Sequence, residues 1–582
     1  MKCRTCEDKG IEANWRLQYG VSIHRTAAEL RASSSTCILC AAIWHGLWQF
    51  PEGRAALADP SHMDIRFSYH KGESFKIRDG HPIPGAGRAH YDPAFTIIAG
   101  LLPGEGFFPW KREGTHISEE LETIPKMPVV EESPLSVKTR DAVMKQIQEC
   151  KTGHEHQLKH HYDFDDGKRK QYVPDRLVDL GSDSSNLDAV LLDDTSKVKQ
   201  PFVALSHCWG GTIPYRTLKA NKRDLCQRIE FSRLSQNFKD AFTVARWLSY
   251  RYIWIDSFCI VQDDREDWLQ QSSKMADVYS GADLTISATR TASHTEGFLT
   301  DRYTDNKLGL TNRLPAGISL YARDCERLEL SHQGINRQPS EHTPLFMRAW
   351  GFQERLLSKR VLHFLNTECE CSEYDTYPDS KYDKEVYHSS SWEELVEQYT
   401  SRKMTCQDDV LPAISAVARD YAYKAKYYAG LMEADLYPSL LWRVKAPRDL
   451  YGGLITPAPI PKRPSIYVAP TFSWASVIGA VEWATNPRPS LQQICRIISY
   501  GTTLVNKKDR FGCISDGYIT INGPSISVEL QSMPKVNPSG KSVTADMGWY
   551  YQHYGLVLMS SAKSPVNKKF FENATDTTVT VI

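Results

Sequence analysis

The hydrophobic and polar positions follow their most regular pattern between Phe202 and Leu299. Three short apolar runs lie in this stretch: FVALS (202–206), YIWIDSFCIV (252–261) and LTIS (284–287). Runs of this length, bounded by polar residues and rich in β-branched and aromatic types, are typical of strands buried on both faces of a parallel sheet. We therefore predict three buried strands in this part of the chain.

Helices are predicted between these strands. Asn237 is suited to cap a helix whose apolar side chains share one face, namely Ala241, Val244, Ala245 and Leu248. The acidic run DDRED (263–267) suits the positive end of a second helix, in which large side chains recur at steps of four and three: Trp268, Ser272, Met275 and Tyr279. Strands that alternate with helices in this way predict a doubly wound α/β sheet.

Ligands of such sheets bind beyond the carboxyl ends of the strands. Residues of the first two predicted strands, or directly after them, that could lie at this edge are therefore candidate ligand-binding residues: Ser206, His207, Cys208, Trp209, Asp256 and Asp263. His207 and Cys208 are adjacent, so on a strand they would point to opposite faces and would not pair as base and nucleophile. Such a pair would need Cys259 or Ser206 instead, and core packing is the alternative role for both cysteines.

A series of motifs in this region resembles fungal heterokaryon-incompatibility (HET) domain proteins. The motifs are VALSHCWGG, DAFTVARWLSYRYIWIDSFCIVQDD, DWLQQSSKMADVYSGADLTISA, GFL and RAWGFQERLLSKRVLHF, in this order. The resemblance implies a role in non-self recognition and cell death, with other incompatibility proteins or a second copy of the chain as partners. It also implies a TIR/flavodoxin-like parallel sheet, and some TIR domains hydrolyse NAD⁺.

The resemblance to TIR domains also implies a catalytic carboxylate early in the second helix. This chain has Gln271 at the position of the expected glutamate, so the negative charge is lost there. Asp267, four residues earlier, and Glu354, in the last motif, are the alternative catalytic carboxylates. Three functions follow: a signalling module that works by interaction, an NAD⁺ glycohydrolase that binds NAD or another nucleotide, or a small-molecule-modifying protein of a biosynthetic cluster.

The composition of the chain limits which partners and which cellular location we expect. Lys plus Arg and Asp plus Glu both number 70 in 582 residues, so no net basic field favours a nucleic acid or an anionic membrane as partner. The longest apolar stretch, CILCAAIWHGLWQF (37–50), is too short and too interrupted to span a bilayer. We expect a cytoplasmic protein whose 14 cysteines are mostly thiols or metal ligands.

Two cysteine pairs near the start of the chain are candidate zinc ligands. They are Cys3 with Cys6 and Cys37 with Cys40, and four thiolates match a tetrahedral structural zinc site. The interval between the pairs is longer than in common zinc ribbons, and His24 could replace one ligand. The alternative is that Cys37 and Cys40 are core residues of a helix. Many HET proteins resemble this chain in having such pairs.

The pattern divides the chain into four parts. Residues 1–60 form the cysteine-paired segment, and residues 61–170 a small β-rich unit with a linker. Residues 171–365 form the α/β domain, and residues 366–582 an α+β region with helices first and strands from about residue 494. A Cys-and-His-rich run near residue 150 has Gln157 where the HET pattern has a final cysteine, so we interpret it as a solvated helix end.

Overall fold

The computed structural model describes the parts of the chain to which every structural statement below refers. These are residues 21–24, 26–49, 54, 57–58, 65–70, 74–79, 93–100, 126–127, 131–153, 172–183, 185–301, 306–308, 319–324, 343–365, 369–373, 391–422, 425–445, 462–483, 491–493, 496–507, 509–525, 559–561 and 575–581.

A seven-stranded mixed sheet forms the centre of the α/β domain, in the order β14-β13-β10-β8-β9-β6-β7. Its strands are β6 (Leu177–Asp179), β7 (Val190–Leu192), β8 (Phe202–Ser206), β9 (Tyr252–Trp254), β10 (Leu284–Ser287), β13 (Arg360–Phe364) and β14 (Cys369–Glu373). The four central strands, β13, β10, β8 and β9, run parallel, and β14, β6 and β7 are antiparallel to their neighbours. The α/β prediction is confirmed, and antiparallel strands flank the parallel core.

The order of the parallel strands defines where a ligand site is expected. Numbered along the chain, β8, β9, β10 and β13 lie in the spatial order 2-1-3-4, which is the order of flavodoxin-like doubly wound sheets. The chain leaves β8 toward β9 on one side and then crosses back to β10 on the other. The topological switch point therefore lies between the carboxyl ends of β8 and β10, where Ser287 pairs with Ser206.

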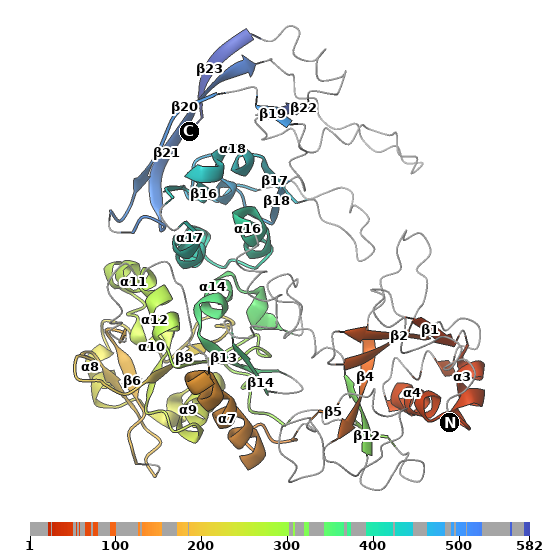
Figure 1. Cartoon of the computed structure of the whole chain (residues 1–582). Helices are drawn as coiled ribbons and strands as arrows, with labels where there is room; N and C mark the ends of the chain where they lie inside the picture. The colour runs from red at the N-terminus through yellow and green to blue at the C-terminus, as the bar shows by residue number, and fades with distance from the viewer. Residues whose placement is uncertain are drawn as a thin grey trace, which may run out of the picture.

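Helices cover both faces of this sheet (Figure 1). One face is covered by α7 (Val137–Gly153) and α9 (Gln236–Trp247), and the other by α12 (Met275–Gly281) and α14 (Ala349–Leu357). The shorter helices are α8 (Lys222–Gln227), α10 (Asp256–Cys259) and α11 (Arg265–Ser272). The predicted apolar face of α9 is buried, and the strand residues of β8, β9 and β10 are buried throughout, as strands with helices on both faces require.

The second predicted strand is shorter than its sequence indicates. The run 252–261 forms only β9, and the chain then turns into the short helix α10. The Asp256 carboxylate accepts the backbone N–H of Ser257 at 2.6 Å, which favours a helical start over continued extension. The apolar residues after Trp254 are therefore buried in a helical turn and not in a strand.

Two predictions about the helices are also corrected. The helix after β9 is split into α11 and α12, and the Ser273 hydroxyl donates to the carbonyl of Gln270 at the break. Ser235 is the N-cap of α9, whereas Asn237 lies in its first turn. The Asn237 amide donates to Thr291 and Ser293 and accepts from Gly297, so it fixes the loop after β10 and does not cap its own helix.

A second sheet lies in the amino-terminal part, in the order β1-β2-β3-β4-β12-β11, with β5 paired to β4. Its strands are β1 (Val21–His24), β2 (Ile65–His70), β3 (Ser74–Asp79), β4 (Pro93–Gly100), β5 (Lys126–Met127), β11 (Asn306–Lys307) and β12 (Ser319–Asp324). Two helices accompany it, α3 (Ala27–Ser34) and α4 (Ile38–Gln49). The predicted β-rich unit thus has strands, and β1, β11 and β12 join it from outside residues 61–170.

The carboxy-terminal part has its own hydrophobic core. Its helices are α16 (Trp392–Thr400), α17 (Ser415–Ala422) and α18 (Leu436–Ser439), with 3₁₀ turns at η6 (Gln407–Asp409) and η7 (Pro412–Ile414). Its strands are β15 (Tyr427–Tyr428), β16 (Leu431–Met432), β17 (Trp442–Val444), β18 (Val481–Trp483), β19 (Leu491–Gln493), β20 (Arg496–Leu504), β21 (Ile514–Ser525), β22 (Met559–Ser561) and β23 (Thr575–Val581). The first strands here begin at Tyr427, earlier than the predicted start near residue 494, and α18 lies between β16 and β17.

Among the helices that the structure describes, none combines the length and the apolar run that a bilayer span requires.

Candidate functional site

The switch point of the sheet holds a buried carboxylate. Glu354 reaches it from α14, and the Ser206 hydroxyl at the end of β8 donates to Glu354 Oε2 at 2.5 Å. Both side chains are buried, with relative exposures of 2% for Glu354 and 4% for Ser206. Two residues separated by 148 positions in the sequence are therefore in direct contact where doubly wound sheets bind ligands.

Two further residues determine the charge state of Glu354. Burial raises the pKa of Glu354, and the nearby Arg348 guanidinium and the Ser206 hydrogen bond oppose this shift. The Tyr279 hydroxyl also hydrogen-bonds Glu354 and donates to the Leu205 carbonyl at 3.2 Å. Arg348 in turn donates to the carbonyl oxygen of His207. Glu354 is thus a buried acid with a cation beside it, and its burial favours the protonated form while the cation opposes this.

Asp256 provides a second carboxylate close to the first. One of its oxygens accepts the Trp209 indole N–H at 2.8 Å, and the other lies 4.0 Å from His207 Nε2. The Asp256 side chain is 17% exposed, so solvent reaches this carboxylate and not Glu354. Asp256 also contributes to the raised pKa of Glu354, because two nearby negative charges repel each other.

His207 lies next to Asp256, on the face of the sheet that α9 covers. Its ring packs edge-to-face on Phe238 at a centroid distance of 5.2 Å, opposite in direction to Ser206, as adjacent strand residues must be. Burial lowers the pKa of His207 to about 4, so the imidazole is neutral at physiological pH. In the described residues, Nε2 of this buried ring has no hydrogen-bond partner.

The two candidate cysteines are not activated nucleophiles. Burial raises the pKa of Cys208 to about 11 and that of Cys259 to about 12. The reactive form of a cysteine is the thiolate, and very little of it exists at neutral pH when the pKa is this high. The alternative interpretation, core packing, fits both residues better than nucleophilic catalysis.

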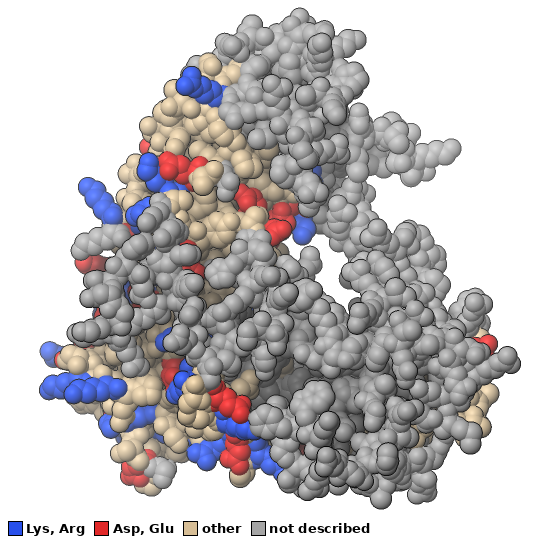
Figure 2. Space-filling view, viewed as in Figure 1, with Lys and Arg blue, Asp and Glu red and all other residues tan. Residues whose placement is uncertain are grey.

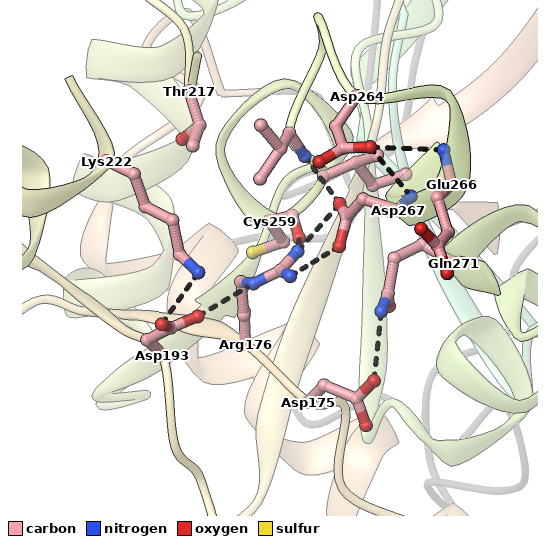
Figure 3. A network of polar contacts seen from close by, with 12 residues as sticks. Asp175, Arg176, Asp193, Thr217, Lys222, Cys259, Asp264, Glu266, Asp267 and Gln271 are labelled. Carbon is pink, nitrogen blue, oxygen red and sulfur yellow. Dashed lines mark hydrogen bonds and ion pairs between the residues drawn. The ribbon is translucent and has the colours of Figure 1, made fainter. Parts of the chain in front are cut away.

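Gln271 and Asp267 belong to a different group of polar contacts (Figure 3). Gln271 donates to Asp175 at 2.9 Å, and Lys274 contacts the same carboxylate. Asp267 holds the Arg176 guanidinium through both oxygens, at 2.5 and 3.0 Å, and accepts the N–H of Val261. These hydrogen bonds and ion pairs join the segment before β6 to the region that follows α10.

The network around Arg176 continues to the edge of the sheet. Arg176 also donates to Asp193 at 2.9 Å and to the Cys259 carbonyl at 2.8 Å, and Lys222 contacts Asp193 at 2.7 Å. Within the described residues, Arg176 thus donates to Asp193, Cys259 and Asp267. Asp267 accepts hydrogen bonds from two residues, Arg176 and Val261. Asp267 therefore has a clear structural role, whereas Glu354 lies at the switch point.

The structure thus sorts the candidate site residues into two groups. The switch-point group brings together Ser206, His207, Cys208, Trp209, Asp256 and Glu354. Gln271 and Asp267 lie in the other network, and Asp263 accepts the Lys219 N–H at 2.8 Å in an exposed loop. Arg348 was not among the predicted site residues, and Tyr279 was predicted only as part of a helix face. The motif RAWGFQERLL, which begins with Arg348, was the signal that could have identified Arg348.

Surface charge does not single out another site on the face drawn in Figure 2. Over the described residues of that face, basic and acidic side chains are interspersed, in keeping with equal totals of Lys plus Arg and Asp plus Glu. Several charges of the described residues are paired, for example Arg228 with Asp188 at 2.7 Å. This face offers no concentrated basic field over the described part of the chain.

One of the comparisons with known proteins found a match, and it covers this part of the chain. Residues 202–354 match the family model described as "Heterokaryon incompatibility protein (HET)", and the match runs from the first residue of β8 to Glu354. Residues 202–354 of the chain therefore match a HET domain. Neither the search of curated proteins nor the search of solved structures found a match.

Half of the proposed zinc ligand set can be placed. Cys37 directly precedes α4 and Cys40 lies in its first turn; both are fully buried, and neither is in a disulfide. Cys3 and Cys6 lie outside the described residues, and within those residues no group of three or more metal-binding side chains is found. The spacing of Cys37 and Cys40 fits one half of a zinc site, and zinc remains a proposal.

We predict that the purified full-length chain contains about one zinc ion, because four thiolates complete a tetrahedral site. Elemental analysis measures the metal, and the double substitution Cys37→Ser with Cys40→Ser should remove it. Cys226→Ser, at a partly buried cysteine far from this segment in sequence, is the control. A wild-type chain without zinc would rule the site out.

We also predict that His207 makes stability depend on pH. The unfolded state binds a proton near the ordinary pKa of 6.5 and the folded state only near 4, so the stabilisation is complete above 6.5 and is lost as the pH falls toward 4. The full loss is about 3 kcal/mol, from the size of this pKa difference. His207→Gln should flatten this part of the profile, as measured by urea unfolding at several pH values.

The comparison with wild type isolates His207. Asp409, whose pKa burial raises to about 6, changes stability in the opposite direction, but it is present in both proteins and cancels in the difference. Equal slopes between pH 4 and 6.5 for His207→Gln and wild type would contradict the buried, neutral imidazole.

Proposed function

We propose that this HET domain protein is a cytoplasmic signalling protein of fungal non-self recognition, in which the HET domain triggers cell death. The observation that carries the proposal is the HET family match, because it covers the part of the chain that forms the switch point. The signal passes by interaction, with another incompatibility protein or a second copy of the chain as partner.

The contacts of the candidate residues support interaction over catalysis in the second helix. Gln271, at the position where TIR domains have glutamate, lacks a charge and donates to Asp175. Asp267, which could replace it, is held by Arg176 and Val261. Moving either side chain to a substrate would break buried or partly buried hydrogen bonds, each of which costs about 1 kcal/mol or more to lose.

Cell death is expected to depend on Glu354. Expression of the chain in a fungal host with its incompatible partner should reduce colony formation, and Glu354→Gln should restore it to near the level of an empty vector. The substitution keeps the shape of the side chain and removes the ionisable carboxyl group next to Arg348. The measurement is the count of viable colonies, with protein levels followed by immunoblot.

Asp263→Asn is the matched control, because this exposed carboxylate lies outside the switch-point group and accepts only a loop N–H in the described structure. It should kill as wild type does. Undiminished killing by a stably expressed Glu354→Gln variant would show that signalling does not require the switch point.

A second candidate function is hydrolysis of the nicotinamide–ribose bond of NAD⁺. It is favoured by one observation: a buried acid, Glu354, and a solvent-reached carboxylate, Asp256, lie together at the switch point. As the bond breaks, its electron pair leaves with nicotinamide and positive charge develops on the ribose; a carboxylate stabilises that charge. Water then bonds to the ribose carbon and releases a proton.

If this reaction occurs, purified wild-type protein should release nicotinamide from NAD⁺, and Glu354→Gln should lower kcat on the order of a hundredfold. Gln271→Glu should leave the rate close to wild type, because Gln271 lies in the Arg176–Asp175 network. Chromatography of nicotinamide measures the rate. No turnover by wild type or by Gln271→Glu would exclude the hydrolase and leave the signalling proposal untouched.

A further inference from the structure

Helix α14 is shared between two hydrophobic cores. Leu357 packs in the core of the α/β domain, and Glu354 points to Ser206 at the end of β8. Ala349 and Phe352 instead belong to the core of the carboxy-terminal part, and Trp350 packs against both cores. In Figure 1, α14 accordingly lies between the central sheet and the helices α16 and α17.

The beginning of α14 is fastened to the carboxy-terminal part by its backbone. Lys403 donates to the Met347 carbonyl at 2.6 Å and accepts the N–H of Ala349 at 3.1 Å. These two hydrogen bonds lie on either side of Arg348 in the chain. The Arg348 side chain extends instead to the α/β domain, where it donates to the His207 carbonyl. The backbone of Arg348 is therefore held by one part of the protein while its guanidinium acts in the other.

Side chains add a second connection, near residues 408 and 409. The Trp350 indole N–H donates to Asp409 Oδ2 at 2.8 Å, and Arg265 lies 3.3 Å from Asp408. Asp409 and Trp350 are both half-buried, so their hydrogen bond is partly shielded from water and worth more than a surface contact. The exposed Arg265–Asp408 pair contributes little by comparison.

We propose that residues 391–422, which we call the positioning module, hold Glu354 and Arg348 in place through α14, so that displacement of this module opens the switch point. A signal received by the carboxy-terminal part would then reach the HET domain without any direct contact with Ser206 or Asp256. The biological meaning rests on the proposed signalling function, but the physical coupling does not.

Cys208 offers a built-in reporter of this coupling. Its thiol follows the end of β8, is only 5% exposed, and is within electrostatic reach of both Arg348 and Glu354. Cys259 is 1% exposed in the same domain, next to the Arg176 network and apart from α14. Loss of the α14 connection should expose the first thiol and not the second.

The test is the rate of N-ethylmaleimide labelling of each thiol in the purified full-length protein, read by peptide mass spectrometry. Trp350→Phe removes the indole N–H together with one ring of the indole, and Asp409→Ala removes the acceptor while leaving the indole in place. Each should speed labelling of Cys208 by about fivefold or more, the effect of losing one buried hydrogen bond, while Cys259 stays within about twofold of wild type.

Trp483→Phe is the matched control. Trp483 lies in the same carboxy-terminal core, and its indole N–H donates to Ser439 at 3.1 Å, far in sequence from the positioning module's contact with Trp350. It should leave Cys208 labelling unchanged. Unchanged Cys208 in the first two variants, a parallel rise of Cys208 and Cys259, or an equal effect of Trp483→Phe would each overturn the proposal.

This readout uses neither cell death nor NAD⁺ turnover. A failure of the proposed function therefore leaves the labelling result standing, and a failed labelling test leaves the proposed function open to its own experiments.

Discussion

The contact between Glu354 and Ser206 is the constraint on which the site depends. A carboxylate removed from water must be neutralised or compensated, and a buried charge left alone is very costly. Here Ser206 donates at 2.5 Å, and the Arg348 guanidinium lies close enough to oppose the rise in the pKa of Glu354. Because β8 and α14 supply these groups, the sheet and the helix must keep one fixed arrangement for the carboxylate to remain buried.

That arrangement extends beyond the domain that the family match covers. The match ends at Glu354, within α14, yet the same helix buries Ala349 and Phe352 in the carboxy-terminal core. One amphipathic helix thus has two buried faces, which explains why so much of α14 is buried. The carboxy-terminal part is therefore structurally joined to the site and not a separate appendage.

The Arg176 network explains how the chain tolerates Gln271. The amide of Gln271 keeps a hydrogen bond with Asp175, and the nearby carboxylate Asp267 is held by a fork of two bonds from Arg176. These groups stabilise the approach of residues 172–179 to the sheet through polar contacts within the protein. Charge at the switch point is supplied separately, by Glu354 and Asp256.

The sequence by itself determined the strands β8 and β10 and the buried face of α9, because apolar periodicity reports local burial. It also located Ser206, Asp256 and Glu354 as candidates. Only the tertiary structure decided that Glu354 meets Ser206, that Asn237 fixes a distant loop, and that the strand starting at Tyr252 ends at Trp254. Those outcomes depend on hydrogen bonds between residues far apart in the chain, or on a local bond such as Asp256 to Ser257 that competes with strand pairing, and neither leaves a periodic trace in the sequence.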